Sequence, residues 1–346
     1  MREWAHKNNI NVERNQETVM YIQDKVAWNA AVEEKLKHMK TLGVDCVALD
    51  LTDPLPKDAG IDLSSPQAAA AFFTRAKATV AAHGLELRTV LATSGYEDIK
   101  KGTAGRDEKI ARLVNALEGM GAAGVPIMAY NFKLLNSKNL RSQATQGRGG
   151  AQYISFDYEQ YLKKPAAPVE PAISEEQMWG NLSYFLKATV PVAEKSGVRM
   201  ALHPDDPPVP YGTPPLAGVA HIASTFDQYR KIFGIVPSAS NGMLFCQGCV
   251  KEMKGVNVYD AIRDMGSAGK IVMVHFRNVR GSFPKFQETF VDDGDVDMFR
   301  ALQTYRDVGF KGPFSLDHSP IFPEAEIANQ AFAVGYLRGL IQAVYR

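Results

Sequence analysis

The sequence predicts a (β/α)8 barrel, the TIM-barrel fold of the α/β class, and three observations favour it. Short apolar runs rich in β-branched and aromatic residues alternate with longer helical patterns, as in the βαβ units of a parallel sheet. Most of the helical patterns close on a glycine directly before the next run. No glycine-rich phosphate loop follows any run, which counts against a doubly wound open sheet.

The barrel elements follow one another regularly along the chain. The first strand is expected at residues 18–23, and a helical pattern follows it from Asp24 to Gly43. The other seven strands are expected at residues 44–51, 85–92, 125–132, 198–204, 241–246, 271–278 and 313–318. Further helices are expected at residues 64–84, 106–124, 174–197, 226–233, 258–269, 296–309 and 325–345. Ser174 and Gln177 fit a capping box at the start of one of these helices.

One long segment interrupts this alternation. Residues 133–173, after the fourth strand, contain a glycine-rich stretch and the proline-rich sequence KKPAAPVEPA. Irregular segments of this length in compact domains are usually functional lids or disordered. We therefore expect a single barrel domain over residues 1–346, with residues 133–173 inserted as a lid after strand four.

Composition and charge exclude several classes of function. The chain is 45% hydrophobic and 22% charged, which is typical of a globular protein. A net charge of +1 gives no electrostatic basis for binding nucleic acid or an anionic membrane, and no apolar run is long enough to span a bilayer. The N-terminus shows no signal peptide and the three cysteines make no disulfide framework, so we expect a cytoplasmic location.

Four consecutive strands end in residue types that bind metal ions. These residues are His203, Cys246, His275 and Asp317. Strand ends converge at the C-terminal mouth of a barrel, where TIM barrels keep their chemistry. Imidazole, thiolate and carboxylate are ligands of zinc, manganese and iron(II), so the set predicts a divalent metal site. The soft thiolate of Cys246 is its weakest member, and Cys249 is an alternative ligand.

Other polar residues near the strand ends are candidates for catalysis or substrate binding. His318 follows Asp317 and suits proton transfer at neutral pH, and Arg277 suits bidentate recognition of a carboxylate. Asp205 and Asp206 are candidates for orienting a metal-bound imidazole. The further candidate substrate-binding residues are Asn131, Asn278 and Arg141. A structural hydrogen bond or a surface ion pair remains an open alternative for several of these residues.

The motifs resemble those of the mannonate dehydratase family. Its landmarks are matched in order by YEDIKKG (96–102), AYNF (129–132), SFDYE (155–159), HPDDPP (203–208), FCQGC (245–249), HFRN (275–278), ETF…DGDVDM (288–298) and DH (317–318). The resemblance implies a xylose-isomerase-like barrel that uses a divalent ion, typically manganese, to dehydrate D-mannonate to 2-keto-3-deoxy-D-gluconate. It implies His203, Cys246, His275 and Asp317 as the metal ligands and His318 as the catalytic histidine.

The chain departs from the family pattern close to that histidine. SLDHS stands where the family has RPDHG, and the tyrosine expected to work with the histidine has no counterpart between His318 and Tyr336. TVMYIQ replaces the family's first strand, Val291 stands at a position that is often histidine, and KLLNSKNLRSQ replaces the usual aromatic context of the lid. An elimination needs both an acid and a base, and the motifs identify only one of them.

We therefore expect a metal-dependent dehydratase, a carbon–oxygen lyase, that acts on a sugar acid, with D-mannonate as the first candidate substrate. Manganese is the first candidate cofactor, with iron(II) and zinc as alternatives. The expected partners are a small sugar acid and a second copy of the chain in a homodimer. A sugar isomerase or epimerase on the same barrel is one alternative function, which the scarcity of glutamates at strand ends disfavours. A metal-dependent sugar-acid binder without turnover is the other.

Overall fold

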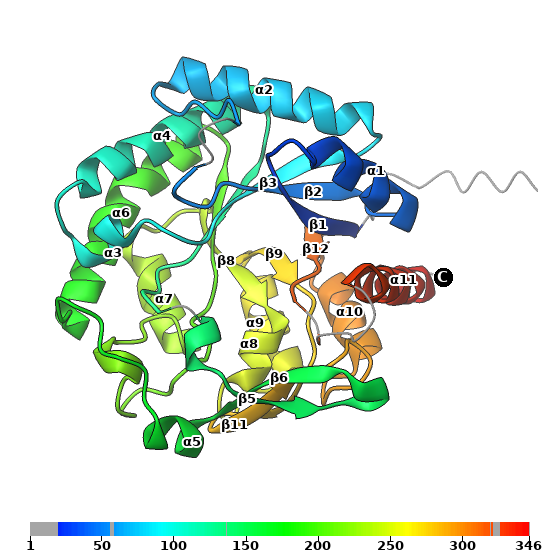
Figure 1. Cartoon of the computed structure of the whole chain (residues 1–346). Coiled ribbons are helices and arrows are strands. Elements are labelled where there is room, and N and C mark those ends of the chain that lie inside the picture. Colours follow the sequence, from blue (N-terminus) through cyan, green and yellow to red (C-terminus); the bar gives the residue numbers. More distant parts are fainter. Residues whose placement is uncertain (1–19, 56–58, 136, 319, 321–325, 346) are drawn as a thin grey trace, which may run out of the picture.

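A closed barrel of eight parallel strands forms the main body of the protein (Figure 1). The computed structural model describes residues 20–55, 59–135, 137–318, 320 and 326–345. In ring order the strands are β1 (Tyr21–Ala27), β12 (Pro313–Ser315), β9 (Ile271–His275), β8 (Asn241–Cys246), β7 (Arg199–Leu202), β4 (Ile127–Tyr130), β3 (Glu86–Ala92) and β2 (Cys46–Asp50). The predicted fold class is therefore confirmed.

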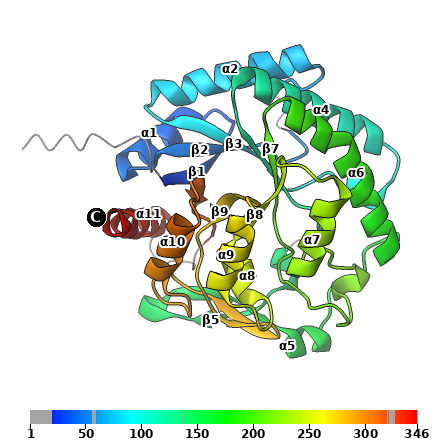
Figure 2. The same ribbon diagram turned by 180° about the vertical axis from the view of Figure 1, so that it is seen from behind.

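Helices surround the barrel, as the two opposite views show (Figures 1 and 2). They are α1 (Val32–Leu42), α2 (Pro66–Ala82), α3 (Glu97–Lys101), α4 (Arg106–Ala123), α5 (Tyr158–Lys163), α6 (Glu175–Lys195), α7 (Phe226–Ile235), α8 (Gln247–Glu252), α9 (Val258–Ser267), α10 (Met298–Asp307) and α11 (Glu326–Val344), with 3-10 turns at Ser137–Leu140, Arg148–Gly150 and Leu216–Gly218. The capping box of Ser174 and Gln177 is present at the start of α6. Among the described residues, none of the helices combines the length and the apolarity that a membrane crossing needs.

The first strand differs from the expectation. The predicted start of the first helix at Asp24 was wrong, because β1 continues to Ala27 and α1 begins only at Val32, while its predicted end at Gly43 is confirmed. Residues 23–27 pair with the whole of β2, so backbone pairing overrides the polar residues of this segment. The predicted start of the strand, residues 18 and 19, lies outside the described residues.

The predicted lid segment contains regular structure that the sequence did not indicate. Its strands β5 (Ser142–Gln146) and β6 (Gln152–Asp157) join β10 (Val279–Ser282) and β11 (Lys285–Glu288) in an antiparallel sheet of order β10-β11-β6-β5. Phe286 of β11 pairs with Phe156 of β6, and their rings stack with centroids 5.4 Å apart. The function of this segment as a lid stays a prediction. Its strand β6 is hydrogen-bonded to β11, which lies in the segment that follows β9.

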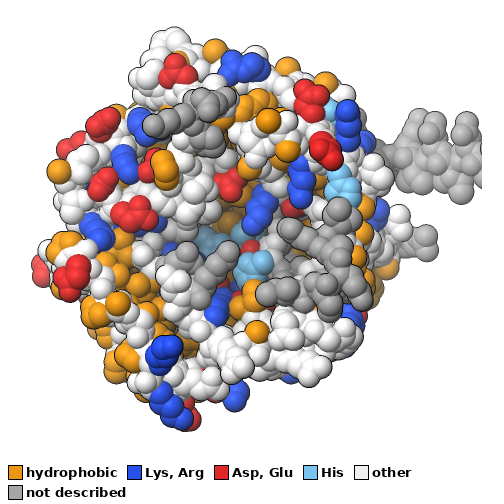
Figure 3. Space-filling model, viewed as in Figure 1, with side chains coloured by type: hydrophobic (Ala, Val, Ile, Leu, Met, Phe, Trp, Pro, Cys, Tyr) orange, Lys and Arg blue, Asp and Glu red, His pale blue; other side chains and the backbone are white. Residues whose placement is uncertain are grey.

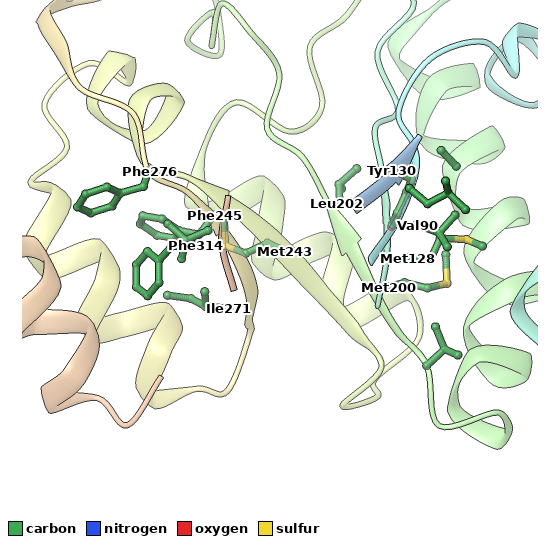
Figure 4. Close-up of a cluster of buried hydrophobic side chains, with 14 of the residues drawn as sticks. Val90, Met128, Tyr130, Met200, Leu202, Met243, Phe245, Ile271, Phe276 and Phe314 are labelled. Atoms are coloured by element: carbon green, nitrogen blue, oxygen red, sulfur yellow. The ribbon is translucent and has the colours of Figure 1, made fainter. Parts of the chain in front are cut away.

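Alternation along the barrel strands separates two apolar layers. In β8, Met243 and Phe245 belong to the large core between the strands and the helices, while Leu244 and Cys246 belong to a smaller cluster. Figure 4 shows part of the large core, with Met243, Phe245 and Phe314 among its side chains. Because successive side chains of a strand point to opposite faces, Cys246 faces the barrel interior rather than the helices.

The contact between α2 and α4 depends on a glycine in α4. A Cβ atom at Gly119 would lie 2.5 Å from the Cβ of Ala69 and 2.7 Å from its carbonyl carbon. We therefore expect Gly119→Ala to push the two helices apart and to destabilise the protein by about 1–3 kcal/mol, as overpacking usually does. Thermal unfolding followed by circular dichroism measures the effect.

Gly180→Ala is the matched control for this substitution. Gly180 lies inside α6, and a Cβ atom there would meet nothing within 4 Å. Alanine is the better helix former, so this variant should be as stable as the unchanged protein or more stable by up to about 1 kcal/mol. Equal melting temperatures for the two variants would contradict the close approach of α2 and α4.

Candidate functional site

The four predicted metal ligands lie together at the C-terminal mouth of the barrel. Cys246 and His275 are the last residues of β8 and β9, and His203 directly follows β7. One ligand atom from each of these three side chains lies within 4.8 Å of the other two. Asp317 completes the group, with Oδ2 3.6 Å from Cys246 Sγ and Oδ1 3.5 Å from His275 Nδ1.

The register of the barrel brings these side chains together. Cys246 is the direct partner of His275 between β8 and β9, and Ser315 is the partner of His275 between β12 and β9. Asp317 follows two residues after Ser315. The imidazole of His203 is oriented by its own loop, because Nδ1 lies 2.6 Å from the carbonyl oxygen of Pro204 and donates to it. Its Nε2 is therefore the nitrogen left to bind an ion.

The residues of this group fit a divalent cation. The Nδ1 atom of His275 is buried and has no hydrogen-bond partner among the described residues. A buried polar atom without a partner is costly, and a bound cation would remove that cost. Two imidazoles, a thiolate and a carboxylate form a donor set that manganese, iron(II) and zinc accept.

A buried arginine lies directly beneath the group. The side chain of Arg277 is 2% exposed, and its Nη1 lies 2.9 Å from Glu252 and 3.2 Å from Glu288. Its Nε lies 3.0 Å from Asp317 Oδ2. A Cβ atom at Gly248 would lie 2.5 Å from that Nε, so the glycine of the CQGC motif makes room for the guanidinium.

The same guanidinium contacts both cysteines of the motif. Its Nη2 lies 3.3 Å from Cys249 Sγ and 3.7 Å from Cys246 Sγ. Burial of the Cys246 thiol acts to raise its pKa, but a hydrogen bond from Cys249 and the charge of Arg277 bring this pKa well below its usual value. This shift favours the thiolate of Cys246, which is the form that binds metal.

His318 lies beside the group and reaches open space. Its Nδ1 lies 2.6 Å from Glu288 Oε2, its Nε2 lies 3.6 Å from Asp317 Oδ2, and its side chain is 39% exposed. Burial acts to lower the pKa of His318, but the charges of Asp317 and Glu288 raise it above the usual value. This shift favours the protonated imidazole.

A cavity of about 450 Å³ opens over these side chains. Its wall includes His203, His275, Asp317, His318, Asp206, Asn131, Lys25, Lys100 and Lys133. The volume is within the range of small-molecule sites. Figure 3 shows histidine side chains in a central hollow of the face drawn in Figure 1, with basic side chains nearby.

The structure separates the remaining predicted site residues into two groups. Asn131 lines the cavity, as predicted for a substrate-binding residue, while Arg277, Arg141 and Asn278 are not among the residues of its wall. Arg141 forms ion pairs with Asp206 and Glu288. The amide of Asn278 donates to the carbonyls of two loop residues, Val291 and Val296. The direct roles of Arg277, Arg141 and Asn278 in catalysis and binding stay predictions. In the structure these three residues hold neighbouring side chains and loops of the site in place.

Three residues of the site were missed in the sequence. Glu288 stands within the ETF motif, but nothing local indicates that it contacts His318, thirty residues later. Lys133 follows the end of β4 closely, and this position at a strand end was an available signal, whereas Lys100 lies in α3, after a loop that follows β3, where no local pattern places it at the barrel mouth. Both lysines line the cavity.

The fold and the site together define the class of protein. A closed parallel barrel with its polar residues clustered at the C-terminal mouth is a TIM-barrel enzyme scaffold. The crystal structure of mannonate dehydratase from Streptococcus suis serotype 2 superimposes with a TM-score of 0.78 and 24% identity, covering 94% of this chain and 95% of that chain. A xylose isomerase-like TIM barrel protein from Mycobacterium smegmatis gives a TM-score of 0.57 at 11% identity, covering 95% and 98%.

Sequence comparison identifies the family within this class. The profile of the D-mannonate dehydratase (UxuA) family matches residues 164–346. Mannonate dehydratase 2 of Halalkalibacterium halodurans is 28% identical over 299 residues, covering 78% of this chain and 85% of that protein. Mannonate dehydratase of Streptococcus equi subsp. zooepidemicus is 29% identical over 307 residues, covering 78% and 82%. The chain belongs to the D-mannonate dehydratase family, so the resemblance predicted from its motifs is confirmed.

The two cysteines can be distinguished as metal ligands by substitution. Cys246 converges with the two histidines, whereas Cys249 lies in a second buried group with Asp206 and Glu252. We expect Cys246→Ala to weaken Mn²⁺ binding by more than about 100-fold, beyond the loss typical of an outer-shell partner. Cys249→Ala removes only a hydrogen bond to that ligand, so it should raise the Kd by about 10- to 100-fold. Calorimetric titration of metal-depleted protein measures both, and a larger loss in Cys249→Ala would place the ion in the second group.

Metal binding should also depend on pH through His275. Burial acts to lower the pKa of His275, but Asp317 and the Cys246 thiolate raise it to about 9. Below this pH the metal-free imidazole is protonated, and binding must displace that proton. Mn²⁺ affinity should therefore fall by about tenfold for each pH unit as the pH drops from 8 to 6. An affinity that stays constant over this range would contradict ligation by His275.

Proposed function

We propose that the chain is a metal-dependent hydro-lyase that converts D-mannonate to 2-keto-3-deoxy-D-gluconate. The observation that carries the proposal is the convergence of His203, Cys246, His275 and Asp317 at the barrel mouth. Three of these residues, His203, His275 and Asp317, line the cavity together with His318. Membership of the D-mannonate dehydratase family supports the same reaction. The cavity of about 450 Å³ is large enough for a six-carbon sugar acid.

The reaction removes a proton from C2 and a hydroxyl group from C3 of the sugar acid. The resulting enol then becomes the 2-keto product. When bound, a divalent ion supplies a Lewis acid that stabilises the negative charge developing next to the substrate carboxylate. We propose manganese on the family resemblance, with zinc and iron(II) as alternatives because one ligand is a thiolate.

His318 is the proposed proton donor to the departing C3 hydroxyl. Its Nδ1 lies 2.6 Å from Glu288 Oε2, and its raised pKa favours the protonated imidazole, which is the form that donates a proton. Glu288 is itself held by Arg277 and Arg141. The two arginines are therefore proposed as positioning residues, because they fix the carboxylate that orients the catalytic histidine.

Asn131 is the proposed hydrogen-bonding residue for a substrate hydroxyl. It lines the cavity, and its side-chain oxygen is buried without a partner among the described residues. A substrate hydroxyl group can donate a hydrogen bond to that oxygen, which then has a partner only when substrate is bound.

The homodimer and the cytoplasmic location stay predictions. Analytical sedimentation tests the first, and cell fractionation tests the second.

The direct test is anaerobic incubation of the Mn²⁺-loaded protein with D-mannonate. We expect a 2-keto-3-deoxy acid to accumulate, detected by its keto group and by mass spectrometry. Loss of the general acid usually reduces turnover by about 10²- to 10⁴-fold, and we expect this reduction in His318→Asn with unchanged Mn²⁺ content.

His83→Asn is the matched control for that substitution. His83 caps the end of α2, where its ring contacts the carbonyl of Thr79, and it is not among the residues of the cavity wall. This variant should keep full activity. Deuterium exchange at C2 without loss of water would instead indicate an epimerase. Absence of any product at full metal occupancy would contradict the dehydration of D-mannonate.

A further inference from the structure

We propose that Lys100 is a second catalytic residue of this site and removes the C2 proton from the sugar acid. This inference rests on the proposed dehydration. It assigns the removal of the C2 proton, a step for which His318, the proposed proton donor, does not account. Lys100 lies in α3, which follows the C-terminal end of β3. In the ring order of the barrel, β3 stands across from β9, the strand that carries His275. Lys100 and His275 line the same cavity from these two sides.

The backbone of Lys100 is held firmly in place. The side-chain amide of Asn181 on α6 donates to the carbonyl of Lys100 at 2.9 Å. Gly102 ends α3 with a φ of +68°, and a Cβ atom there would lie 2.5 Å from Asn181 Oδ1. The close contact between α3 and α6 therefore favours glycine at this position. This contact holds the backbone of Lys100 in place beside the cavity.

The side chain of Lys100 is buried but has no ionic partner. It is 4% exposed, and beside the main cavity it also lines a small apolar space with Tyr130, Phe132 and Phe185. The described residues provide no hydrogen bond or ion pair to its ammonium group, whereas Lys133 nearby donates to Ser137 at 2.6 Å. A buried lysine with a purely structural role is normally paired with a carboxylate.

This environment suits a lysine that must lose its proton. Burial lowers the pKa of Lys100 to about 8, with Glu97 on the same helix opposing the shift and Lys133 adding to it. Asp50, Asp206 and Lys25 are the other charged groups of the cavity wall on these sides. An appreciable fraction of Lys100 is therefore a free amine near neutral pH, which is the form that acts as a general base.

The two proton transfers balance when Lys100 and His318 act together. The free amine of Lys100 takes the C2 proton and becomes an ammonium group. The electron pair of the C2–H bond forms the C2–C3 double bond as the C3–O bond breaks, and the oxygen leaves as water with the proton from His318. Lys100 then returns its proton to solvent, and the enol becomes the 2-keto acid.

Two substitutions separate a base from a group that only attracts the substrate carboxylate. Lys100→Arg keeps a positive charge but cannot lose its proton near neutral pH, and Lys100→Met removes the charge with a similar shape. We expect both variants to lose about 10²- to 10⁴-fold in kcat, with the KM of Lys100→Arg changed only a few-fold.

The pH profile gives a readout that a structural role would not change. Because the base must be deprotonated and the acid protonated, kcat/KM of the Mn²⁺-saturated protein should be bell-shaped in pH. It should rise with the titration of Lys100 near 8 and fall at higher pH, where His318 loses its proton. This rise should be absent from the residual activity of Lys100→Arg. Lys101→Met is the matched control, since Lys101 is the next residue of α3 and its ammonium donates to the carbonyl of Glu170.

The outcomes also separate this proposal from the proposed function. An active protein whose Lys100→Arg variant keeps its kcat, while Lys100→Met raises only KM, would overturn the role of Lys100 as a base and leave the dehydration intact. Absence of any keto-deoxy acid from the unchanged protein would overturn both. Carbon-13 NMR of reductively methylated protein adds a measurement without turnover: a Lys100 resonance that titrates near 10.5 rather than near 8 would also overturn the base role.

Discussion

The guanidinium of Arg277 lies buried between three carboxylates, and the rest of the site depends on this contact. Asp317, Glu252 and Glu288 each lie within 3.2 Å of one of its nitrogens. Carboxylates so far from water would be very costly without a cation, and removal of one partner would leave the others uncompensated. Burial acts to raise the pKa of Asp317, but His318, His275 and Arg277 hold it well below its usual value. Arg277 also holds Glu288 in place beside His318, so one ion-pair network supports both parts of the site.

The two sheets of the protein meet in this network. The barrel supplies Cys246 and His275, which are paired neighbours on β8 and β9. The small antiparallel sheet supplies Glu288, the last residue of β11, which is the carboxylate closest to His318 Nδ1. Arg141, directly before β5, also forms an ion pair with Glu288. The segment inserted after β4 therefore takes part, through Arg141, in the support of His318.

The sequence predicted what depends on local pattern and on the common geometry of barrels. The bounds of β8 were predicted as observed because its apolar run is short and sharply limited, and the four ligands come together because parallel strands end at one edge. Contacts between distant segments determine three features that no local sequence pattern indicates. These are the extent of β1, the pairing of Phe156 with Phe286 and the burial of Arg277. Lys100 was missed for the same reason, because its lack of a partner is visible only in three dimensions.

The central claim is that one ion is held by ligands from four neighbouring strand ends. Anomalous X-ray diffraction from crystals loaded with Mn²⁺ and a sugar acid tests it most directly. The account predicts a single anomalous peak within bonding distance of His203, Cys246, His275 and Asp317, with the sugar acid completing the coordination. A peak at the neighbouring group of Asp206, Cys249 and Glu252, or a peak that these four side chains do not ligate, would contradict it.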